Sequence, residues 1–274
     1  VLMLAFNLNA QSKRAADNYF KKFAYVKSAE LYEKIYKKGD STQKVVSRLG
    51  DSYYFNSKTE ESEKWYSKLF SLVDHEKIPS EYFFRYAQSL KSNGEYAKSD
   101  LWLEKFREVN SSDSRGQKLS SSPNYLKEFS TSRKNYVGIK NLNINSEYSD
   151  FGIFIGKENV YFASTKPDGV QKKKYAWNDQ PFLNIYEGIE VLSSDPETGE
   201  SELEKIQQIK LLKELNTRFH EAQAVVTKDG NTMYFTRDNF NNKRRKLKTD
   251  SNRTSHLKIY KATKKDSFWG NIEE

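Results

Sequence analysis

Small and large apolar residues recur at helical spacing through the N-terminal part of the chain, from position 12 to position 110. Three small residues, Ala16, Gly50 and Ala87, are each followed three positions later by a large apolar residue and twelve positions later by a serine. The separation is 34 from position 16 to 50 and 37 from position 50 to 87. The three additional residues fit a loop around 76–79, which contains a proline. This periodicity indicates three similar helical units.

A period of about 34 residues with small and aromatic residues at these offsets resembles the tetratricopeptide repeat (TPR), in which each unit is a pair of antiparallel helices. We therefore predict three TPR units over residues 12–110. The small residues are expected where two helices cross closely, because a longer side chain would push the helices apart. Three units is about the minimum for a stacked solenoid with a continuous core. An ordinary helical bundle with chance periodicity is the alternative.

The resemblance implies a concave surface formed by the first helix of each unit. The groove candidates on these helices are Lys13, Asp17, Phe20, Lys44, Ser47, Asp51, Tyr54, Glu81, Phe84, Gln88 and Lys91. Some TPR domains hold a C-terminal carboxylate with a clamp of lysines and asparagines, but Asp51 and Gln88 occupy positions where asparagines would be needed. We expect a groove for a peptide or helix of a partner protein. Alternatively, these positions are solvated or pack against a second domain.

The helical spacing ends in a serine-rich stretch, NSSDSRGQKLSSSP at 110–123, and we predict a linker over 111–135. From 136 to 274, short alternating runs of Ile, Val, Tyr and Phe predict strands. These runs also repeat. Residues 150–155, 160–164 and 183–187 are similar to 221–226, 233–237 and 257–261, at offsets of 71, 73 and 74. We expect 190–192 to supply a fourth strand after the third.

Tight turns at 156–159 and 228–231 separate the first two strands of each unit, and Asp229-Gly230 favours a hairpin. Short antiparallel units that repeat radially are typical of a β-propeller. The predicted fold is therefore α plus β, with an N-terminal TPR α-solenoid followed by part of a propeller over 136–274. About two blades are present, whereas a closed propeller needs at least four. We expect unpaired edges and an exposed core face, as in a chain cut short.

Three phrases, NSEYSDFG at 145–152, WNDQPFL at 177–183 and TKDGNTMYFTR at 227–237, resemble the PD40 (WD40-like) propeller of Bacteroidetes OmpA-family envelope proteins. Members of that family, including PorE-like proteins associated with type IX secretion and gliding, combine an N-terminal TPR, this propeller and a C-terminal OmpA-like domain that binds peptidoglycan. The resemblance implies a scaffold in the periplasm or at the outer membrane that binds other envelope proteins. The OmpA-like domain is absent from this sequence, so peptidoglycan binding would require a further domain.

The N-terminal run VLMLAF is the longest uncharged apolar stretch near either end, and the first charges are Lys13 and Arg14. We expect residues 1–11 to be the remnant of an export signal that ends at Ala10. No initiator methionine or basic segment precedes the run, and Leu8 is large for its position before the cleavage point. A short buried N-terminal segment is the alternative. No run approaches the ~18–20 apolar residues of a transmembrane helix.

Composition and motifs exclude several kinds of chemistry. Apolar residues make up only 36% of the chain, but the 14% of aromatic residues can supply core volume. The chain has no cysteine and three histidines, so thiolate and histidine-rich metal centres are not expected. His220-Glu221 lacks the second histidine of a zinc-protease motif, and the chain has no phosphate loop or serine elbow. We predict no enzymatic activity, catalytic residue, metal or cofactor. The alternative is an envelope enzyme whose active site lies in blades or a domain outside this chain.

The net charge of +9 is concentrated in two long loops, 166–180 with +2 and 237–256 with +5. Equivalent loops of successive blades emerge on one face of a propeller. The predicted basic face consists of Lys172, Lys173, Lys174, Lys243, Arg244, Arg245, Lys246 and Lys248. Such a face could meet an anionic partner, although two solvated loops that maintain solubility are the alternative. Nucleic acid is not the expected partner, because the basic run at 243–248 lacks interleaved aromatic residues.

Overall fold

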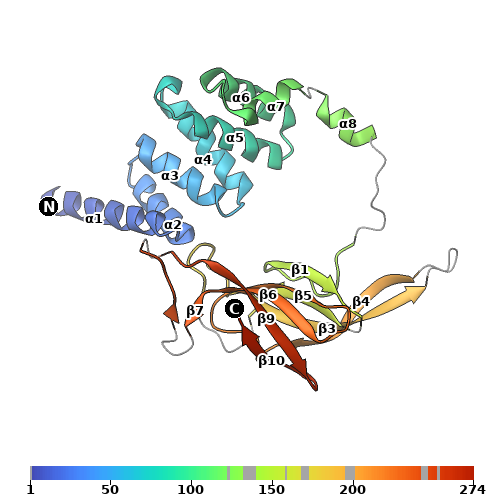
Figure 1. Ribbon diagram of the computed structural model, residues 1–274. Coiled ribbons are helices and arrows are strands. Elements are labelled where there is room, and N and C mark those ends of the chain that lie inside the picture. The colour runs from blue at the N-terminus through green and yellow to red at the C-terminus, as the bar shows by residue number, and fades with distance from the viewer. Residues whose placement is uncertain are drawn as a thin grey trace. The chain divides into compact units, whose positions relative to one another are not determined.

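The computed structural model divides the chain into two compact units, one helical and one formed of sheets (Figure 1). The helical unit comprises residues 1–135 with 176–179, and the sheet unit comprises 136–175 with 180–274. The structure describes residues 2–121, 124–131, 140–157, 159–167, 173–194, 201–241, 246–251 and 254–274.

The helical unit contains consecutive helix pairs. They are α1 (Leu2–Lys21) with α2 (Tyr25–Lys37), α3 (Gln43–Tyr54) with α4 (Thr59–Leu72), and α5 (Ser80–Ser92) with α6 (Tyr96–Val109). Figure 1 shows the pairs following one another in chain order. A short 3-10 helix, η1 (His75–Lys77), precedes α5 and occupies the place expected for the three additional residues. The helix pairs and their spacing define a TPR-like helical region.

The small residues lie where the pairs cross, as the sequence predicts. A Cβ atom built on Gly50 would lie 2.4 Å from the ring Cε1 of Tyr66, so α3 and α4 can approach this closely only with glycine at position 50. The serines of the pattern, Ser28, Ser62 and Ser99, are all 0% exposed. The remaining core is largely aromatic and apolar, which explains how a chain with few apolar residues builds a solenoid.

Two further helices, α7 (Ser114–Ser121) and α8 (Tyr125–Thr131), occupy the segment for which we predicted a linker. α7 packs closely on α6, because a Cβ atom on Gly116 would lie 3.2 Å from the Cα of Arg107. The guanidinium of Arg115 lies 4.3 Å from the centre of the Phe84 ring. These contacts come from a glycine and an arginine. A search for periodic apolar side chains therefore misses the helix.

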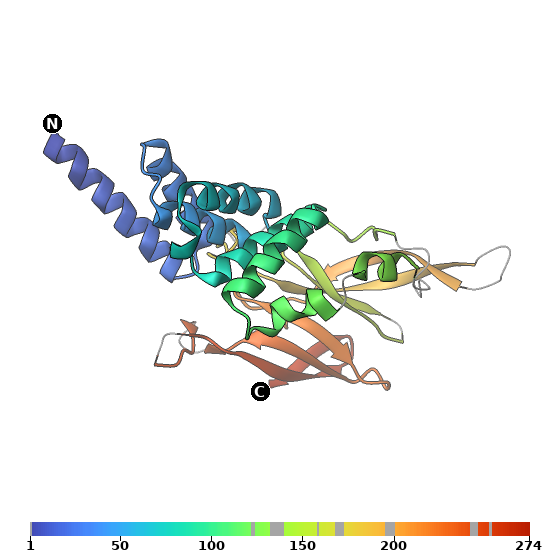
Figure 2. The ribbon, with the colours of Figure 1, turned by 90° about the horizontal axis from the view of Figure 1, so that it is seen from above.

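The helix α1 begins at Leu2, so the segment 2–11 continues the helix that pairs with α2. In Figure 2 the N-terminal half of α1 extends beyond α2. Its helical conformation does not test whether residues 1–10 are removed, and the export signal remains a prediction. In the described ranges no helix is both long and apolar enough to cross a bilayer.

The sheet unit contains two four-stranded antiparallel sheets. The first is formed by β1 (Asp150–Ile155), β2 (Val160–Ser164), β3 (Asn184–Ser194) and β4 (Ser201–Leu211), and the second by β5 (Glu221–Val226), β6 (Thr232–Asp238), β9 (Leu257–Lys265) and β10 (Phe268–Glu273). Between β6 and β9, β7 (Phe240–Asn241) pairs with β8 (Lys246–Leu247). In each sheet the four strands pair in chain order, as in a meander, with the β7–β8 ribbon inserted between β6 and β9 of the second sheet. The residues that the structure describes form no closed propeller.

The fourth strand of the first sheet differs from the prediction. Residues 190–192 belong to β3, and the fourth strand is β4, where Ile206 pairs with Glu190. Strand-forming residues continue through Leu192, and the turn-forming Pro196 and Gly199 follow only later in the sequence. Strand β3 is therefore 11 residues long and forms an extended hairpin with β4.

The two sheets pack face to face through strands β1, β2 and β3 of the first sheet against β5 of the second. Tyr161 and Ile185 of the first sheet share one core with Met233 and Phe235 of the second. The first strand of each sheet, β1 and β5, contains a bulge, with positive φ at Gly152 (66°) and at Gln223 (51°). Gly152 and Gln223 occupy equivalent positions of the sequence repeat, so the structural repeat follows it.

Candidate partner-binding surface

The predicted groove residues lie on the first helix of each pair. Lys13, Asp17 and Phe20 are on α1, Lys44, Ser47, Asp51 and Tyr54 on α3, and Glu81, Phe84, Gln88 and Lys91 on α5. Two ion pairs connect these helices. The Lys44 ammonium lies 2.6 Å from the Asp17 carboxylate, and the Arg85 guanidinium lies 2.7 Å from Asp51. The three helices therefore share one polar surface.

Asp51 lies beneath this surface and has a structural role, because it is only 1% exposed. Its carboxylate accepts hydrogen bonds from the hydroxyls of Tyr66 (3.0 Å) and Tyr82 (3.1 Å), and from the guanidinium of Arg85 (2.7 Å). Burial raises the pKa of Tyr66 well above its usual 10, and the charge of Asp51 raises it further, so this hydroxyl remains a donor. Asp51 thus connects α3, α4 and α5 instead of facing a ligand.

Other candidates include both buried and exposed residues. Ser47 is 7% exposed and donates to the carbonyl of Lys44, whereas the Lys44 side chain is 60% exposed. The Glu81 carboxylate is 39% exposed. The ammonium of Lys91 lies 4.1 Å from the centre of the Tyr125 ring in α8. Lys44, Glu81 and Lys91 therefore bring charge of both signs to the surface.

Three arginines that the sequence analysis does not name complete the surface. The Arg48 guanidinium lies 3.9 Å from the centre of the Phe20 ring, and Arg115 stacks on Phe84. Burial opposes the charge of Arg85, but the Asp51 carboxylate outweighs it and the pKa of Arg85 is raised. Arg48 and Arg85 each stand three or four positions from an acidic residue on the same helix. This spacing of opposite charges on one helix is the sequence pattern that could have identified Arg48 and Arg85.

The predicted basic face of the sheet unit is described only in part. Lys173, Lys174, Lys246 and Lys248 are exposed. Lys172, Lys243, Arg244 and Arg245 lie outside the described residues. Lys246 belongs to β8, so its loop contains a short two-stranded ribbon. The gathering of these cations on one face remains a prediction.

Glu221 is the first residue of β5, and His220 precedes it. The Nδ1 of His220 accepts a hydrogen bond from the main-chain N–H of Leu183 (3.1 Å), and burial lowers the pKa of His220. The Glu221 carboxylate accepts from the main chain (2.9 Å) and the hydroxyl (2.7 Å) of Thr217, and burial raises its pKa to about 7. Across the described ranges, no three side chains of the metal-ligating types His, Cys, Asp or Glu come together.

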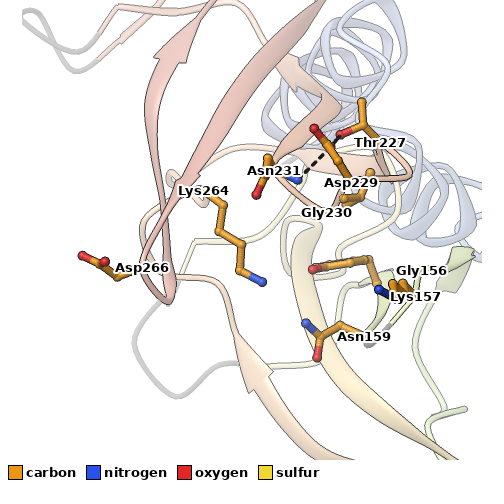
Figure 3. Close-up of a pocket in the computed structure, with 11 residues that line it drawn as sticks. Gly156, Lys157, Asn159, Thr227, Asp229, Gly230, Asn231, Lys264 and Asp266 are labelled. Carbon is orange, nitrogen blue, oxygen red and sulfur yellow. Dashed lines mark hydrogen bonds between the residues drawn. The ribbon is translucent and has the colours of Figure 1, made fainter.

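A polar pocket of about 280 Å³ lies among three hairpin turns of the sheet unit (Figure 3). It is lined by Gly156, Lys157, Asn159, Tyr161, Val226, Thr227, Asp229, Gly230, Asn231, Lys264 and Asp266. The Asp229 carboxylate accepts hydrogen bonds from the Thr227 hydroxyl (2.5 Å) and the Asn231 main chain (3.1 Å), and these bonds lower its pKa. Because Asp229 remains ionised at neutral pH, it cannot serve there as an acid. The pocket offers hydrogen bonds to a small polar group.

Comparison with known proteins identifies solved structures only. No family model and no curated protein matches the chain. The C-terminal part of a TPR repeat-containing protein from Cytophaga hutchinsonii is 23% identical and has a TM-score of 0.38, and the match covers 42% of this chain and 44% of that one. The Sgt2 TPR domain from Aspergillus fumigatus is 14% identical over 51% of this chain and 91% of its own, with a TM-score of 0.37. The first TPR of Spaghetti (RPAP3), solved with an HSP90 peptide, is 13% identical over 43% and 93%, with a TM-score of 0.37.

Proposed function

We propose that this protein is a non-enzymatic scaffold that binds other proteins through the first helices of its TPR-like region. The observation that carries the proposal is the surface shared by α1, α3 and α5. Buried Asp51 holds α3 and α5 in place, and the exposed side chains of Lys44 and Glu81, which pair with Asp17 and Arg115, bring charge of both signs to the same surface. A rigid helical surface with fixed charges suits recognition of a peptide or helix, because little ordering is left to occur on binding.

The side chains of this surface favour an internal segment of a partner protein over a free C-terminus as the ligand. A carboxylate clamp would need free donors at the centre of the groove, but the guanidinium of Arg85 is already bonded to Asp51. The partner is therefore expected to bind through an internal segment that carries both acidic and basic side chains, and not through a free C-terminus.

For the sheet unit, the proposed identity is two blades of a PD40-type propeller. Two four-stranded meanders, with bulges and turns at equivalent positions of the sequence repeat, support this assignment. The family resemblance supports a place among exported, outer-membrane-associated proteins of the periplasm, as an accessory of type IX secretion or gliding. In that role, attachment to peptidoglycan would depend on a domain outside these residues.

Crosslinking in envelope fractions tests the binding surface. The groove variant carries Lys44→Glu and Lys91→Glu, and the matched control carries Lys34→Glu and Lys64→Glu on the second helices α2 and α4. Wild type and control should crosslink to the same proteins, and the groove variant should lose them. If both variants retain the wild-type set, the groove proposal is wrong.

The proposed location has a separate test. When the chain is expressed from its own gene, mass spectrometry of the mature protein should find Gln11 at the N-terminus, in the envelope fraction. A protein that retains residues 1–10 and fractionates with cytosolic enzymes would contradict export but leave the binding proposal intact.

A further inference from the structure

A short segment far along the chain, Ala176–Asp179, belongs to the helical unit. Within it, the indole N–H of Trp177 donates to the main-chain carbonyl of Phe55 (3.0 Å). The indole lies perpendicular to the ring of Tyr25, with ring centres 5.0 Å apart, and stacks on Phe23 at 5.8 Å. Tyr25 in turn stacks on Phe55 at 4.9 Å. Phe23, Tyr25 and Phe55 therefore form a three-sided site for one indole, which we call the indole socket.

The socket contains a hydrogen-bond acceptor that the helix α3 does not use. This helix ends at Tyr54, and the main-chain N–H groups of residues 56–58 donate to the carbonyls of Tyr53 and Tyr54. The Phe55 carbonyl accepts from the Trp177 indole instead. Carbonyls at the end of a helix carry partial negative charge and need a donor from outside the helix. An indole N–H is such a donor, whereas a phenylalanine ring is not.

Phe23 has an unusual backbone conformation. Its φ is 59°, in the left-handed region that residues other than glycine rarely adopt. Position 23 is seven residues after Ala16, and the equivalent positions of the other two units are Ser57 and Gly94, also with positive φ. Phe23 is 57% exposed, so burial in the core does not explain a phenylalanine at this position. Its stacking on Trp177 does, because strained residues collect at binding sites.

The indole socket adjoins the partner-binding surface of the first helices. The ring of Phe20, a groove candidate on α1, lies 5.2 Å from the ring of Tyr25. The ring of Tyr54, a groove candidate on α3, lies 5.7 Å from that of Phe55. The Arg85 guanidinium of α5 lies 4.9 Å from the centre of the Phe55 ring. A peptide that binds along α1, α3 and α5 can therefore place one side chain in the socket.

Trp177 differs from the tryptophans of the cores. Trp65 and Trp269 are 5% and 3% exposed, whereas Trp177 is half-buried. Its described contacts are the hydrogen bond to Phe55 and the ring contacts with Phe23 and Tyr25. Only three neighbouring residues enter the helical unit with it. A second tryptophan therefore has few contacts to replace.

We propose that the indole socket recognises a tryptophan of the partner protein, and that Trp177 occupies the socket as an internal competitor until that tryptophan replaces it. This inference rests on the proposed binding surface and names one side chain that the partner contributes. The partner segment carries a tryptophan in addition to its acidic and basic residues. In the absence of a partner, Trp177 covers the apolar rings of the socket.

A peptide with the chain's own sequence tests the socket. The probe is KKYAWNDQP, residues 173–181, acetylated and amidated and with 5-fluorotryptophan as its tryptophan. Fluorine NMR measures its binding to the full chain. Trp177→Ala empties the socket, so this variant should bind the probe about tenfold more tightly than wild type does. Equal binding by wild type and Trp177→Ala, or binding by neither, overturns the proposal.

A second peptide tests the hydrogen bond to the Phe55 carbonyl. The tryptophan of this peptide is methylated at the indole nitrogen and has no N–H to donate. Its binding to the Trp177→Ala variant should be about fivefold weaker than that of the probe, because the carbonyl is left without a donor. Equal binding of the two peptides overturns the assignment of this carbonyl to an indole.

Phe23→Gly separates binding from stability. Glycine adopts positive φ without strain, so the thermal midpoint of this variant should change little. In the Trp177→Ala background, Phe23→Gly should weaken binding of the probe about tenfold, because one wall of the socket is lost. The matched control is Tyr96→Ala in the same background, since Tyr96 is 41% exposed on α6 and should not affect the probe. Undiminished binding by the Phe23→Gly variant overturns the proposal.

Crosslinking in envelope fractions relates the socket to the partner. An excess of KKYAWNDQP should lower the yield of crosslinked proteins with Trp177→Ala, and the same peptide with alanine in place of tryptophan should not. If the yield is unaffected, the partner does not use the socket and the inference is wrong, although loss of crosslinks in the Lys44→Glu, Lys91→Glu variant would still support the binding surface. If that groove variant keeps its partners while the peptide still competes, the surface is wrong and the socket is retained.

Discussion

Two buried carboxylates, one in each unit, show how differently an acid can be used in a protein interior. Asp51 of the helical unit is 1% exposed and Glu221 of the sheet unit is 0% exposed. Asp51 accepts from a guanidinium and two phenols contributed by two neighbouring helices. Glu221 accepts from one threonine, while Arg237 approaches to 3.3 Å but donates its hydrogen bond to a carbonyl. Similar burial therefore surrounds one acid with several donors, whereas the other has one threonine and a pKa that burial raises.

Removal of the Asp51 carboxylate should have the largest effect on stability. Asp51→Ala removes the buried acceptor shared by Tyr66, Tyr82 and Arg85 and leaves half-buried Arg85 only its pair with Glu81, which should cost about 3–5 kcal/mol of the free energy of unfolding. Asp17→Ala is the control, because Asp17 also bonds a tyrosine and a lysine but its side chain is 24% exposed. The control should lose only about 1 kcal/mol. Urea unfolding followed by helix-sensitive circular dichroism measures both, and equal losses would contradict the special role of Asp51.

The stability of the sheet unit should depend on the protonation of Glu221. Because the folded state raises the pKa of Glu221 to about 7, it binds more protons than the unfolded chain between pH 4.5 and 7. The free energy of unfolding contributed by Glu221 should therefore fall by roughly 3 kcal/mol as pH rises through this window and stay constant above it. Glu221→Gln should abolish this change.

Oxidation of Met233 in increasing urea reports this transition, because Met233 is 0% exposed in the sheet unit and the chain has only one other methionine. Measurements at pH 5 and pH 7.5, for wild type and for Glu221→Gln, give the difference directly. If wild type and Glu221→Gln change stability equally between these pH values, Glu221 stays ionised beside Arg237, because buried His220 contributes the same change to both proteins.

A smaller effect is expected from close packing in the helical unit. Gly50→Ala places a methyl group 2.4 Å from Tyr66, whose hydroxyl bonds Asp51, and should cost about 1–3 kcal/mol. Gly270→Ala in β10 is the control, since a Cβ atom there meets no other atom within 4 Å. Thermal unfolding should show a lower midpoint for the Gly50 variant and little change for the Gly270 variant. A neutral Gly50→Ala would mean that α3 and α4 separate without cost.

The sequence predicted those features that depend on residues within one repeat. The close approach at Gly50 follows from the small residue at a fixed offset, and both sheets follow from an alternating pattern that occurs twice along the chain. Asp51 was predicted only as a groove residue. Its burial depends on Tyr66 and Tyr82, which stand 15 and 31 positions away on other helices. No local pattern carries that information.

Other features escaped prediction for a related reason. The fourth strand was placed at 190–192 because strand propensity marks where a strand can form but not where it must end. The surface arginines Arg48, Arg85 and Arg115 gain their roles from aromatic rings on neighbouring helices. From the sequence alone, charged residues on a helix are expected to be solvated, because the local pattern does not show their partners on other helices.

The helix α7 limits how many repeats the solenoid can hold. A stack of helix pairs leaves an apolar seam at its last member, and repeat arrays need a terminal element with a polar outer side to cover it. In this chain eight residues with a single leucine do so, through Gly116 against α6 and Arg115 against Phe84. A fourth pair could join only by displacing them. Extension of the array at this end is therefore blocked by a segment shorter than one repeat helix.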